Sequence, residues 1–150
     1  MDQMTIRQAT RDDAAAISAL IRHTVRRSNA VDYSPEVIEL IVANFTADKV
    51  TERMAARDVY ICQIGRRIVG TVSLAGDRLH SMFVDPDAQR TGIGSQLVAH
   101  LEAHARKSSV RDIRLSSSLT ARDFYEKLGY RVLGFEERDD GSTFRMAKTL

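Results

Sequence analysis

Residues 78–101 read RLHSMFVDPDAQRTGIGSQLVAHL, and the rest of the chain is organised around this stretch. Leu79 to Val84 is an apolar, strand-forming run, and Pro86 cannot continue it as a paired strand. From Ile93 onward, apolar residues recur on one face of a helix. The stretch therefore predicts a strand, a tight loop and a helix, in that order.

The loop before this helix carries Gly92-Ile93-Gly94, the only Gly-x-Gly of the sequence. Both glycines lack the Cβ atom that would hold a ligand away from the backbone. The first turn of a helix has N–H groups without internal partners, and the helix dipole makes that end electropositive. Together with the charge of Arg90, these features predict a site for a phosphate or pyrophosphate group. The alternative interpretation is a plain turn at the start of a helix.

Two familiar phosphate-binding motifs are excluded or disfavoured. The string Gly-x-x-x-x-Gly-Lys-Ser/Thr does not occur, which excludes a Walker-type loop. A dinucleotide fingerprint requires a third glycine where this chain has Leu97. It also requires an acidic residue that ends the next strand, whereas Asp112 stands at the beginning of its predicted strand and does not end it. A nicotinamide cofactor is therefore disfavoured.

The stretch resembles the acetyl-CoA site of the GNAT superfamily of N-acetyltransferases. The family signature, Gln/Arg-x-x-Gly-x-Gly/Ala after a strand, is matched by Gln89, Gly92 and Gly94. A second block, residues 117–130 (SSLTARDFYEKLGY), is similar to the later family motif Ala-x-x-Phe-Tyr-x-x-x-Gly-Phe/Tyr, at a spacing that the family commonly shows. The order of predicted strands and helices also fits, so the resemblance covers essentially all 150 residues.

The resemblance implies one N-acetyltransferase domain over residues 1–150, with an α+β fold. This fold has α/β/α layers around a mixed, mostly antiparallel sheet of about seven strands. The implied reaction transfers the acetyl group of acetyl-CoA to a primary amine by direct attack in a ternary complex. The pantetheine arm is expected along the strand, and the pyrophosphate on the amides of the glycine loop. The residues so assigned to acetyl-CoA are Met82, Phe83, Val84, Gln89, Arg90, Thr91, Gly92, Ile93, Gly94, Ser95, Ser118 and Tyr125.

Two residues of the second block, Tyr125 and Ser118, stand at positions that contact acetyl-CoA in the family that the sequence resembles. Tyr125 occupies the position where many family members keep a tyrosine close to the sulfur, and a phenol can protonate a departing thiolate. The alternative is an aromatic anchor, because Tyr125 shares the apolar stripe of its helix with Phe124 and Leu128. Ser118 stands where many relatives carry an asparagine that contacts the pantetheine chain, and the shorter serine reaches less far.

The general base is not defined by a motif. His80 lies on the central strand and titrates near neutral pH, which suits a base. The alternative is an ordinary strand histidine that is satisfied by a neighbour or by water. In similar proteins the first inter-helix region usually walls the acceptor site, and here it contains Asp32, Tyr33 and Glu36. The other three histidines, His23, His100 and His104, are expected at the surface.

The composition sets the class of protein. At 150 residues, with 43% hydrophobic and 28% charged residues, the chain has the size and balance of one globular domain. The net charge of +2 gives no electrostatic case for a nucleic acid or a membrane as the main partner. The single cysteine, Cys62, excludes an internal disulfide, and no Cys/His cluster has zinc spacing, so no metal is expected. No signal peptide or membrane-length apolar run is present, and we expect a soluble, cytoplasmic protein.

The remaining elements follow from periodicity, turn residues and caps. Asp12 and Asp13 predict one helix start, and Ser34-Pro35 predicts another. Thr120 with Asp123 predicts a capping box at the last helix, which Gly129 closes. The other predicted segments are strands at 5–8, 59–64, 68–74, 112–116, 130–136 and 143–148, and a helix at about 48–56.

Two other classes of protein remain open from the sequence. One is an acyl-CoA-binding sensor or regulatory module that has the cofactor site but no productive acceptor pocket. The other is the disfavoured nucleotide-binding oxidoreductase, which would prefer NAD to CoA. The acceptor amine is not identified, and a small molecule, a peptide N-terminus and a protein lysine all fit. A homodimer through the terminal strands is an expectation that comes from the resemblance alone.

Overall fold

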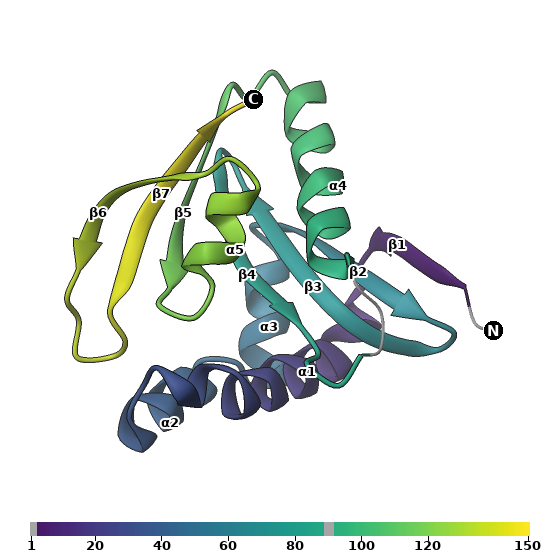
Figure 1. The fold of residues 1–150 in the computed structure, drawn as a ribbon. Helices are drawn as coiled ribbons and strands as arrows, with labels where there is room; N and C mark the ends of the chain where they lie inside the picture. The colour runs from purple at the N-terminus through teal and green to yellow at the C-terminus, as the bar shows by residue number, and fades with distance from the viewer. Residues whose placement is uncertain (1–2, 89–91) are drawn as a thin grey trace.

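The computed structural model describes residues 3–88 and 92–150. Within these ranges the chain forms one sheet of seven strands with helices on both faces, which confirms the predicted α+β architecture (Figure 1). The strands are β1 (Met4–Gln8), β2 (Asp58–Ile64), β3 (Arg67–Ala75), β4 (Arg78–Val84), β5 (Asp112–Ser118), β6 (Arg131–Glu136) and β7 (Thr143–Thr149). The helices are α1 (Ala14–Arg27), α2 (Pro35–Ala43), α3 (Ala47–Met54), α4 (Ile93–Lys107) and α5 (Arg122–Lys127), with short 3-10 turns at Arg11–Asp13 and Asn29–Val31.

The sheet is antiparallel except at its centre. Its strand order is β1-β2-β3-β4-β5-β7-β6, and the one parallel pair is β4 with β5. These two strands pair only at Arg78 and Arg114, after which they diverge. In Figure 1, β5, β7 and β6 form the left-hand part of the molecule, and α5 lies near the point where β4 and β5 separate. Beyond Arg78, the edge of β4 that faces β5 is therefore not paired with another described strand.

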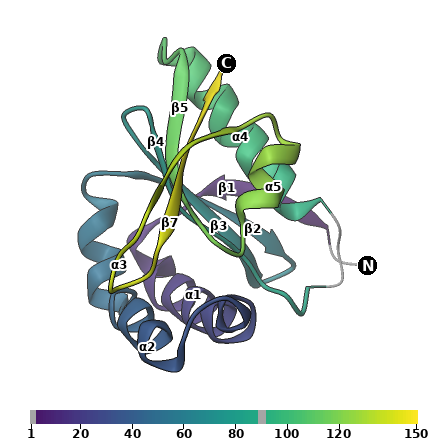
Figure 2. The same ribbon diagram turned by 60° about the vertical axis from the view of Figure 1, so that its left-hand side comes forward.

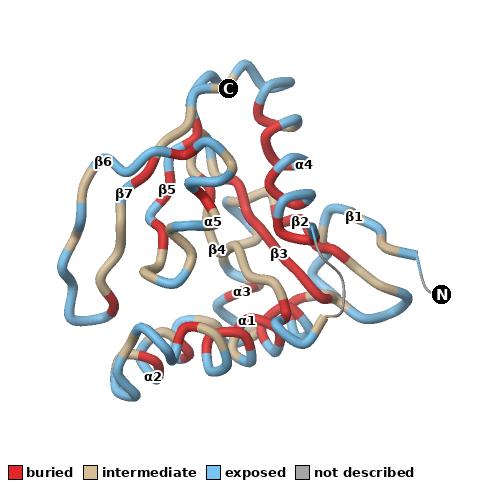
Figure 3. Tube along the Cα trace, in the orientation of Figure 1, coloured by how far each residue is buried: buried red, intermediate tan, exposed pale blue. Residues whose placement is uncertain are grey.

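The sheet separates two apolar cores. Helices α1, α2 and α3 lie on one side of it, and α4 and α5 lie on the other (Figure 2). On the α4 side, Leu97 and Leu101 are fully buried, and burying a leucine contributes roughly 2 kcal/mol. On the α1 side, Ile17 and Ile21 are buried against Ile61 of β2. Figure 3 shows buried residues running along β3 and along α1 and α4. No helix within residues 3–88 and 92–150 is both long and apolar enough to cross a membrane.

Neighbouring residues in the chain determine where each helix begins, and the sequence predicts most of the helix starts correctly. Ser34 caps α2 by accepting a hydrogen bond from the Val37 N–H at 3.3 Å, with Pro35 in the first helical position. The predicted capping box of Thr120 with Asp123 is wrong, because α5 starts later and its N-cap is Ala121. The turn that precedes α5 is closed instead by the Ser118 hydroxyl, which accepts a hydrogen bond from the Ala121 N–H at 3.2 Å.

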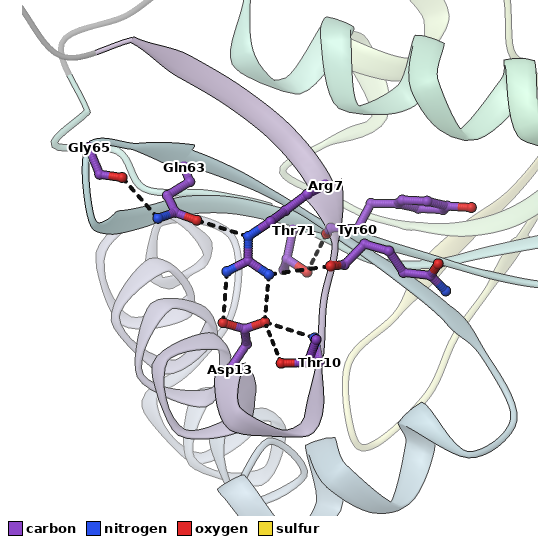
Figure 4. Close-up of polar contacts among 8 residues, drawn as sticks. Arg7, Thr10, Asp13, Tyr60, Gln63, Gly65 and Thr71 are labelled. Atoms are coloured by element: carbon purple, nitrogen blue, oxygen red, sulfur yellow. Dashed lines mark hydrogen bonds and ion pairs between the residues drawn. The ribbon is translucent and has the colours of Figure 1, made fainter.

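A polar network fixes α1 against the edge of the sheet (Figure 4). The Arg7 guanidinium of β1 donates two hydrogen bonds to the Asp13 carboxylate, at 2.9 and 3.0 Å. It also donates to the Gln63 side chain of β2 at 3.1 Å. Asp13 accepts a further hydrogen bond from the Thr10 N–H at 2.8 Å, as a residue in the first helical turn does in a capping box. The network ties two strands to the start of the helix whose other end lines the candidate site.

Strand β4 contains a bulge. Thr71 pairs with Phe83 but Ser73 pairs with His80, so β4 has one residue more than β3 in this interval. Ser81 has a φ of +53°, in the left-handed region that serine adopts rarely. Because of the extra residue, Met82 and Val84 pack against the α4-side core together with Leu79, whereas Phe83 packs against the α1-side core.

Candidate active site

Two adjoining cavities lie where β4 and β5 diverge. We call the first the glycine-side cavity, because Gly92 and Gly94 line it, and its volume is about 330 Å³. The second is the hairpin-side cavity, which the β6–β7 hairpin lines through Asp140, Gly141 and Thr143, and its volume is about 220 Å³. Residues from the 3-10 turn after α1, from β4, from the end of β5 and from the segment that follows it line both cavities and join them. The shared residues are Asn29, Met82, Phe83, Ser118 and Ala121.

The glycine-side cavity brings together most of the residues predicted to bind the cofactor. Those that line it are Met82, Phe83, Val84, Gly92, Ile93, Gly94 and Ser118. Ser95 is exposed and does not line either cavity. Gln89, Arg90 and Thr91 lie outside the described residues, so their predicted part in the pyrophosphate site stays a prediction.

Glycine is required at positions 92 and 94 for two different physical reasons. Gly92 is the N-cap of α4 and has a φ of +82°, which favours glycine over any residue with a side chain. Gly94 is buried in the first turn, and an added Cβ would lie 2.9 Å from Met82 Cε and 3.0 Å from the Phe124 ring. Because Met82 and Phe124 also line the glycine-side cavity, a side chain at position 94 would crowd the wall of that cavity.

Each cavity also has a buried hydroxyl without a hydrogen-bond partner. The Thr24 Oγ1 atom of α1 is buried without a partner, and Thr24 lines the glycine-side cavity. The Thr143 Oγ1 atom of β7 is likewise buried without a partner, and Thr143 lines the hairpin-side cavity. Buried polar groups in proteins are normally satisfied, so unpaired hydroxyls at two cavity walls fit sites that hold polar ligands.

The hairpin-side cavity is lined by a tyrosine that joins three segments. The Tyr33 hydroxyl donates a hydrogen bond to the Ser142 carbonyl at 2.7 Å and accepts one from the Leu119 N–H at 2.9 Å. Burial raises the pKa of Tyr33, so the phenol stays protonated at neutral pH. Gly141, with a φ of +118°, packs against Tyr33, and an added Cβ would lie 3.6 Å from its ring. Of the three residues predicted to wall the acceptor site, Tyr33 lines this cavity, while Asp32 and Glu36 do not.

Tyr125 lines the hairpin-side cavity, and only 4% of its surface is exposed. Its ring packs edge-to-face against Phe124 at 5.2 Å and Tyr130 at 5.6 Å, so the predicted role of an aromatic anchor fits. Burial also raises the pKa of Tyr125 well above its ordinary value of 10.0. The hydroxyl is therefore protonated at neutral pH, as a proton donor must be.

His80 is half-buried on β4 and lines neither cavity. Burial lowers the pKa of His80 from 6.5 to about 4, and the positive charges of Arg57, Arg78 and Arg53 contribute to the shift. The imidazole is therefore uncharged at neutral pH. Its neighbour Ser81 does line the hairpin-side cavity, so contact with an acceptor would pass through that residue. The role of His80 as a base stays a prediction.

Several residues that line the cavities carry no sequence signal. Thr24 and Asn29 come from α1 and the turn after it, and Phe45 follows α2. Asp140 is the one carboxylate among the described residues that line the hairpin-side cavity. Hydrogen bonds from Arg138 lower the pKa of Asp140, which makes it a weak base. None of these positions belongs to a motif, and only the folded chain brings them to the site.

One polar cluster lies outside the two cavities. His23, Asp85 and Asp87 place their ligating atoms within 4.8 Å of one another. Both carboxylates already have cationic partners, since Arg67 contacts Asp85 at 2.6 Å and Arg27 contacts Asp87 at 3.1 Å. The cluster is an ion-pair network that joins α1 to the segment after β4.

Comparisons with known proteins agree on one family. The family model described as an acetyltransferase (GNAT) domain matches residues 29–150. An aminoglycoside N(6')-acetyltransferase type 1 from Stenotrophomonas maltophilia is 30% identical, with 95% of this chain and 92% of that protein covered. The solved GCN5-related N-acetyltransferase from Rhodopseudomonas palustris matches with a TM-score of 0.92 and 25% identity, covering 100% of this chain and 98% of the other. The PaiA N-acetyltransferase of Thermoplasma acidophilum, solved in complex with coenzyme A, has a TM-score of 0.82 and 21% identity, with 99% of both chains covered.

Proposed function

The chain belongs to the GNAT family of acetyltransferases, and from this premise we propose that it transfers the acetyl group of acetyl-CoA to a primary amine by direct attack in a ternary complex. In this proposal residues 1–150 act as one catalytic domain. The observation that carries the proposal is the pair of adjoining cavities that share Met82 and Phe83. Two ligands that meet at these two residues can react with each other without a covalent enzyme intermediate.

The glycine-side cavity is the proposed site of the acetyl-CoA arm. Its fit rests on the crowded position of Gly94, on the unpaired Thr24 hydroxyl and on the open edge of β4. Acetyl-CoA supplies a thioester, whose carbonyl carbon accepts a nucleophile and whose thiolate leaves. Backbone N–H groups on the open edge of β4 are proposed to hold the arm and to polarise the carbonyl, as fixed donors do for a developing negative charge.

The hairpin-side cavity is the proposed site of the amine. Attack forms a C–N bond and breaks the C–S bond, so the amine loses one proton and the thiolate gains one. The buried, protonated hydroxyl of Tyr125 is the proposed donor to the sulfur. His80 is the proposed acceptor of the amine's proton, by way of Ser81. It is uncharged at neutral pH, but its lowered pKa makes it a weak base, as the lowered pKa of Asp140 does for that carboxylate.

Two further features belong to the proposal. We propose a cytoplasmic location, which is compatible with the one cysteine, Cys62, being buried and outside any disulfide. We also propose a homodimer that uses the edge strand β6, where Leu133 and Phe135 expose 50% and 55% of their surface. An exposed apolar edge strand is a surface that chains tend to cover by pairing.

The experiment that tests the function starts from the purified protein with acetyl-CoA, CoA, NAD and ATP in a thermal-shift assay. Stabilisation by acetyl-CoA and CoA but not by NAD is expected, because a ligand at about a hundred times its Kd stabilises a protein by roughly 2.7 kcal/mol. Thiol release from acetyl-CoA with a panel of amines then measures turnover. Binding of acetyl-CoA without turnover on any amine would favour a sensor module, and the absence of any shift would refute the cofactor site.

A further inference from the structure

A small cleft beside the hairpin-side cavity is lined by two arginines. Arg53 lies in the last turn of α3, and Arg57 follows that helix. The cleft has a volume of about 20 Å³, and the hydroxyl residues Thr71, Ser73 and Ser81 of β3 and β4 also line it. We call it the arginine cleft. It shares Phe45 and Ser81 with the hairpin-side cavity, so the cleft and that cavity adjoin at these two residues.

Neither guanidinium has a carboxylate within 4.0 Å among residues 3–88 and 92–150. The Arg53 Nη1 atom is buried and has no hydrogen-bond partner. The rest of the Arg53 guanidinium lies over the Phe45 ring, 4.9 Å from its centre. Within the described part of the chain, the Arg57 side chain donates one hydrogen bond, to the Ser81 hydroxyl at 3.5 Å. Both arginines are half-buried, and the planar fork of donors of an arginine is suited to binding an anion.

A third arginine strengthens the positive field. Arg78 donates to the Ser116 hydroxyl at 2.8 Å, and Ser116 lines the hairpin-side cavity. Arg78 has no carboxylate partner in the described part of the chain either. Burial lowers the pKa of both His80 and Arg57, and neighbouring positive charges, including that of Arg53, lower both further. An anion in the arginine cleft would satisfy the buried donor and relieve the repulsion between like charges.

We propose that the arginine cleft binds a carboxylate of the acceptor, and that the acceptor is therefore a small amine that carries a carboxylate group. This inference rests on the proposed function, since it names the class of amine that occupies the hairpin-side cavity. The cleft admits only a small part of an anion, because a volume of about 20 Å³ accommodates little more than one water-sized oxygen atom, and one oxygen of a carboxylate meets this limit.

The same charges disfavour other acceptors. An acceptor with several ammonium groups, such as an aminoglycoside, would bring like charges towards Arg53, Arg57 and Arg78. A protein lysine brings one ammonium group and no carboxylate of its own. The structure therefore assigns the arginine cleft a selective role, in which it attracts one charged end of the acceptor while the amine end lies towards Met82 and Phe83.

The test compares amines that differ only in the anionic group. The probes are ω-amino carboxylates with two to five methylene groups and the matching ω-amino carboxamides, assayed by thiol release from acetyl-CoA. In the longer pairs the amine lies far from the carboxylate, so the two members of these pairs differ little in amine pKa. We expect kcat/KM to be at least tenfold higher for the carboxylate member of the best pair. An equal or higher value for the carboxamides throughout the series would overturn the proposal.

Three variants identify the group that is responsible. Arg53→Gln and Arg57→Gln are each expected to remove the carboxylate preference by raising KM for the carboxylate at least tenfold, while KM for the carboxamide changes less than twofold. Arg66→Gln removes the same charge from the β2–β3 turn, outside both cavities and the cleft, and is expected to leave the preference unchanged. A preference that survives both cleft substitutions would overturn the proposal. If Arg53→Gln does not fold, the Arg57→Gln variant and the wild-type ratio of kcat/KM for carboxylate to carboxamide still test the proposal.

A binding measurement separates this inference from the proposed function. Isothermal titration of the CoA-loaded protein with the same probe pairs needs no turnover. Carboxylate binding that is at least tenfold tighter than carboxamide binding, and is lost in Arg57→Gln, would support the arginine cleft even in a protein that acetylates no amine. Turnover of amines without any such preference would leave the acetyltransferase intact and refute the cleft. If CoA does not bind, the titration is made on the protein alone and has the same two outcomes.

Discussion

Replacing Gly94 by alanine tests the proposed cofactor site most directly. The new methyl group would lie 2.9 Å from Met82 Cε and 3.0 Å from the Phe124 ring. The methionine end is flexible and can move away, but the Phe124 ring is packed against Tyr125 and can yield less. Overpacking of this kind costs roughly 1–3 kcal/mol, and better helix propensity returns up to about 1 kcal/mol. We therefore expect a net loss of about 1–2 kcal/mol, or a Tm lower by roughly 2–8 °C at this chain length.

The effect on the ligand should exceed the effect on stability. Met82, Phe124 and Gly94 all line the glycine-side cavity, so displacement of the first two narrows the space for acetyl-CoA. A tenfold weaker Kd would reduce the stabilisation at a ligand concentration of a hundred wild-type Kd from roughly 2.7 to about 1.4 kcal/mol. The assay is a thermal shift with and without acetyl-CoA, followed by a titration calorimetry measurement of Kd.

A second glycine separates the two effects. An alanine Cβ at Gly70 would lie 2.8 Å from Leu97 Cδ1, so Gly70→Ala also overpacks a contact with α4, but Gly70 lines neither cavity. We expect Gly70→Ala to lower the Tm and to keep the full ligand-induced shift. If Gly94→Ala also keeps the full shift, or if both variants lose it equally, Gly94 is a packing residue and the assignment of this cavity to acetyl-CoA is refuted.

Three further substitutions test the other assignments. Tyr125→Phe should lower kcat by about 10²-fold without weakening acetyl-CoA binding, and an unchanged kcat in the thiol-release assay would leave Tyr125 an anchor only. His80 has a pKa of about 4 in the fold against 6.5 ordinarily, so the unfolded chain binds the proton first and stability should fall as the pH drops from 6.5 to 4. Urea titrations at several pH values measure the free energy of unfolding, and for His80→Gln this energy should not show the fall between pH 6.5 and 4. A pH–rate profile that the substitution leaves unchanged would exclude His80 as the base. Asp13→Asn should lower the free energy of unfolding by about 1 kcal/mol at pH 7. Because Arg7 lowers the pKa of Asp13, this difference should shrink below pH 3.8. The control, Asp12→Asn, should change the free energy of unfolding little.

Local patterns account for what the sequence predicts well. The apolar spacing after Ile93 defines the buried face of α4, and Leu97 and Leu101 are both fully buried. The glycines at 92 and 94 are needed for a backbone conformation and for a close contact, both of which are properties of a few neighbouring residues. The Thr120 capping box fails for one local and one long-range reason. The Ser118 hydroxyl closes the turn before α5, and the Thr120 hydroxyl instead accepts a hydrogen bond from the Asn29 amide at 3.4 Å, from 91 residues away in the chain.

The walls of the two cavities could not be predicted in the same way. Thr24 and Asn29 reach the site only because α1 packs across the sheet, and Asp140 only because the β6–β7 hairpin folds back onto α2. These contacts join residues far apart in the chain and leave no periodic signal. The bulge in β4 is also invisible, since simple alternation from Leu79 would place Met82 and Val84 on the face opposite to the one they occupy.

The proposed reactive centre lies where the sheet departs from regular pairing. In a regular sheet the N–H and C=O groups of β4 would bond to β5 and could not hold a ligand. Here the pairing with β5 ends after Arg78, and the bulge with its left-handed Ser81 follows three residues later. The bulge turns Met82 towards the glycine-side cavity wall that contains Gly94, and it leaves Ser81 on the boundary between the hairpin-side cavity and the arginine cleft. One irregularity therefore sets both the place where the thioester is proposed to lie and the route by which an acceptor's charge is proposed to reach Arg53 and Arg57.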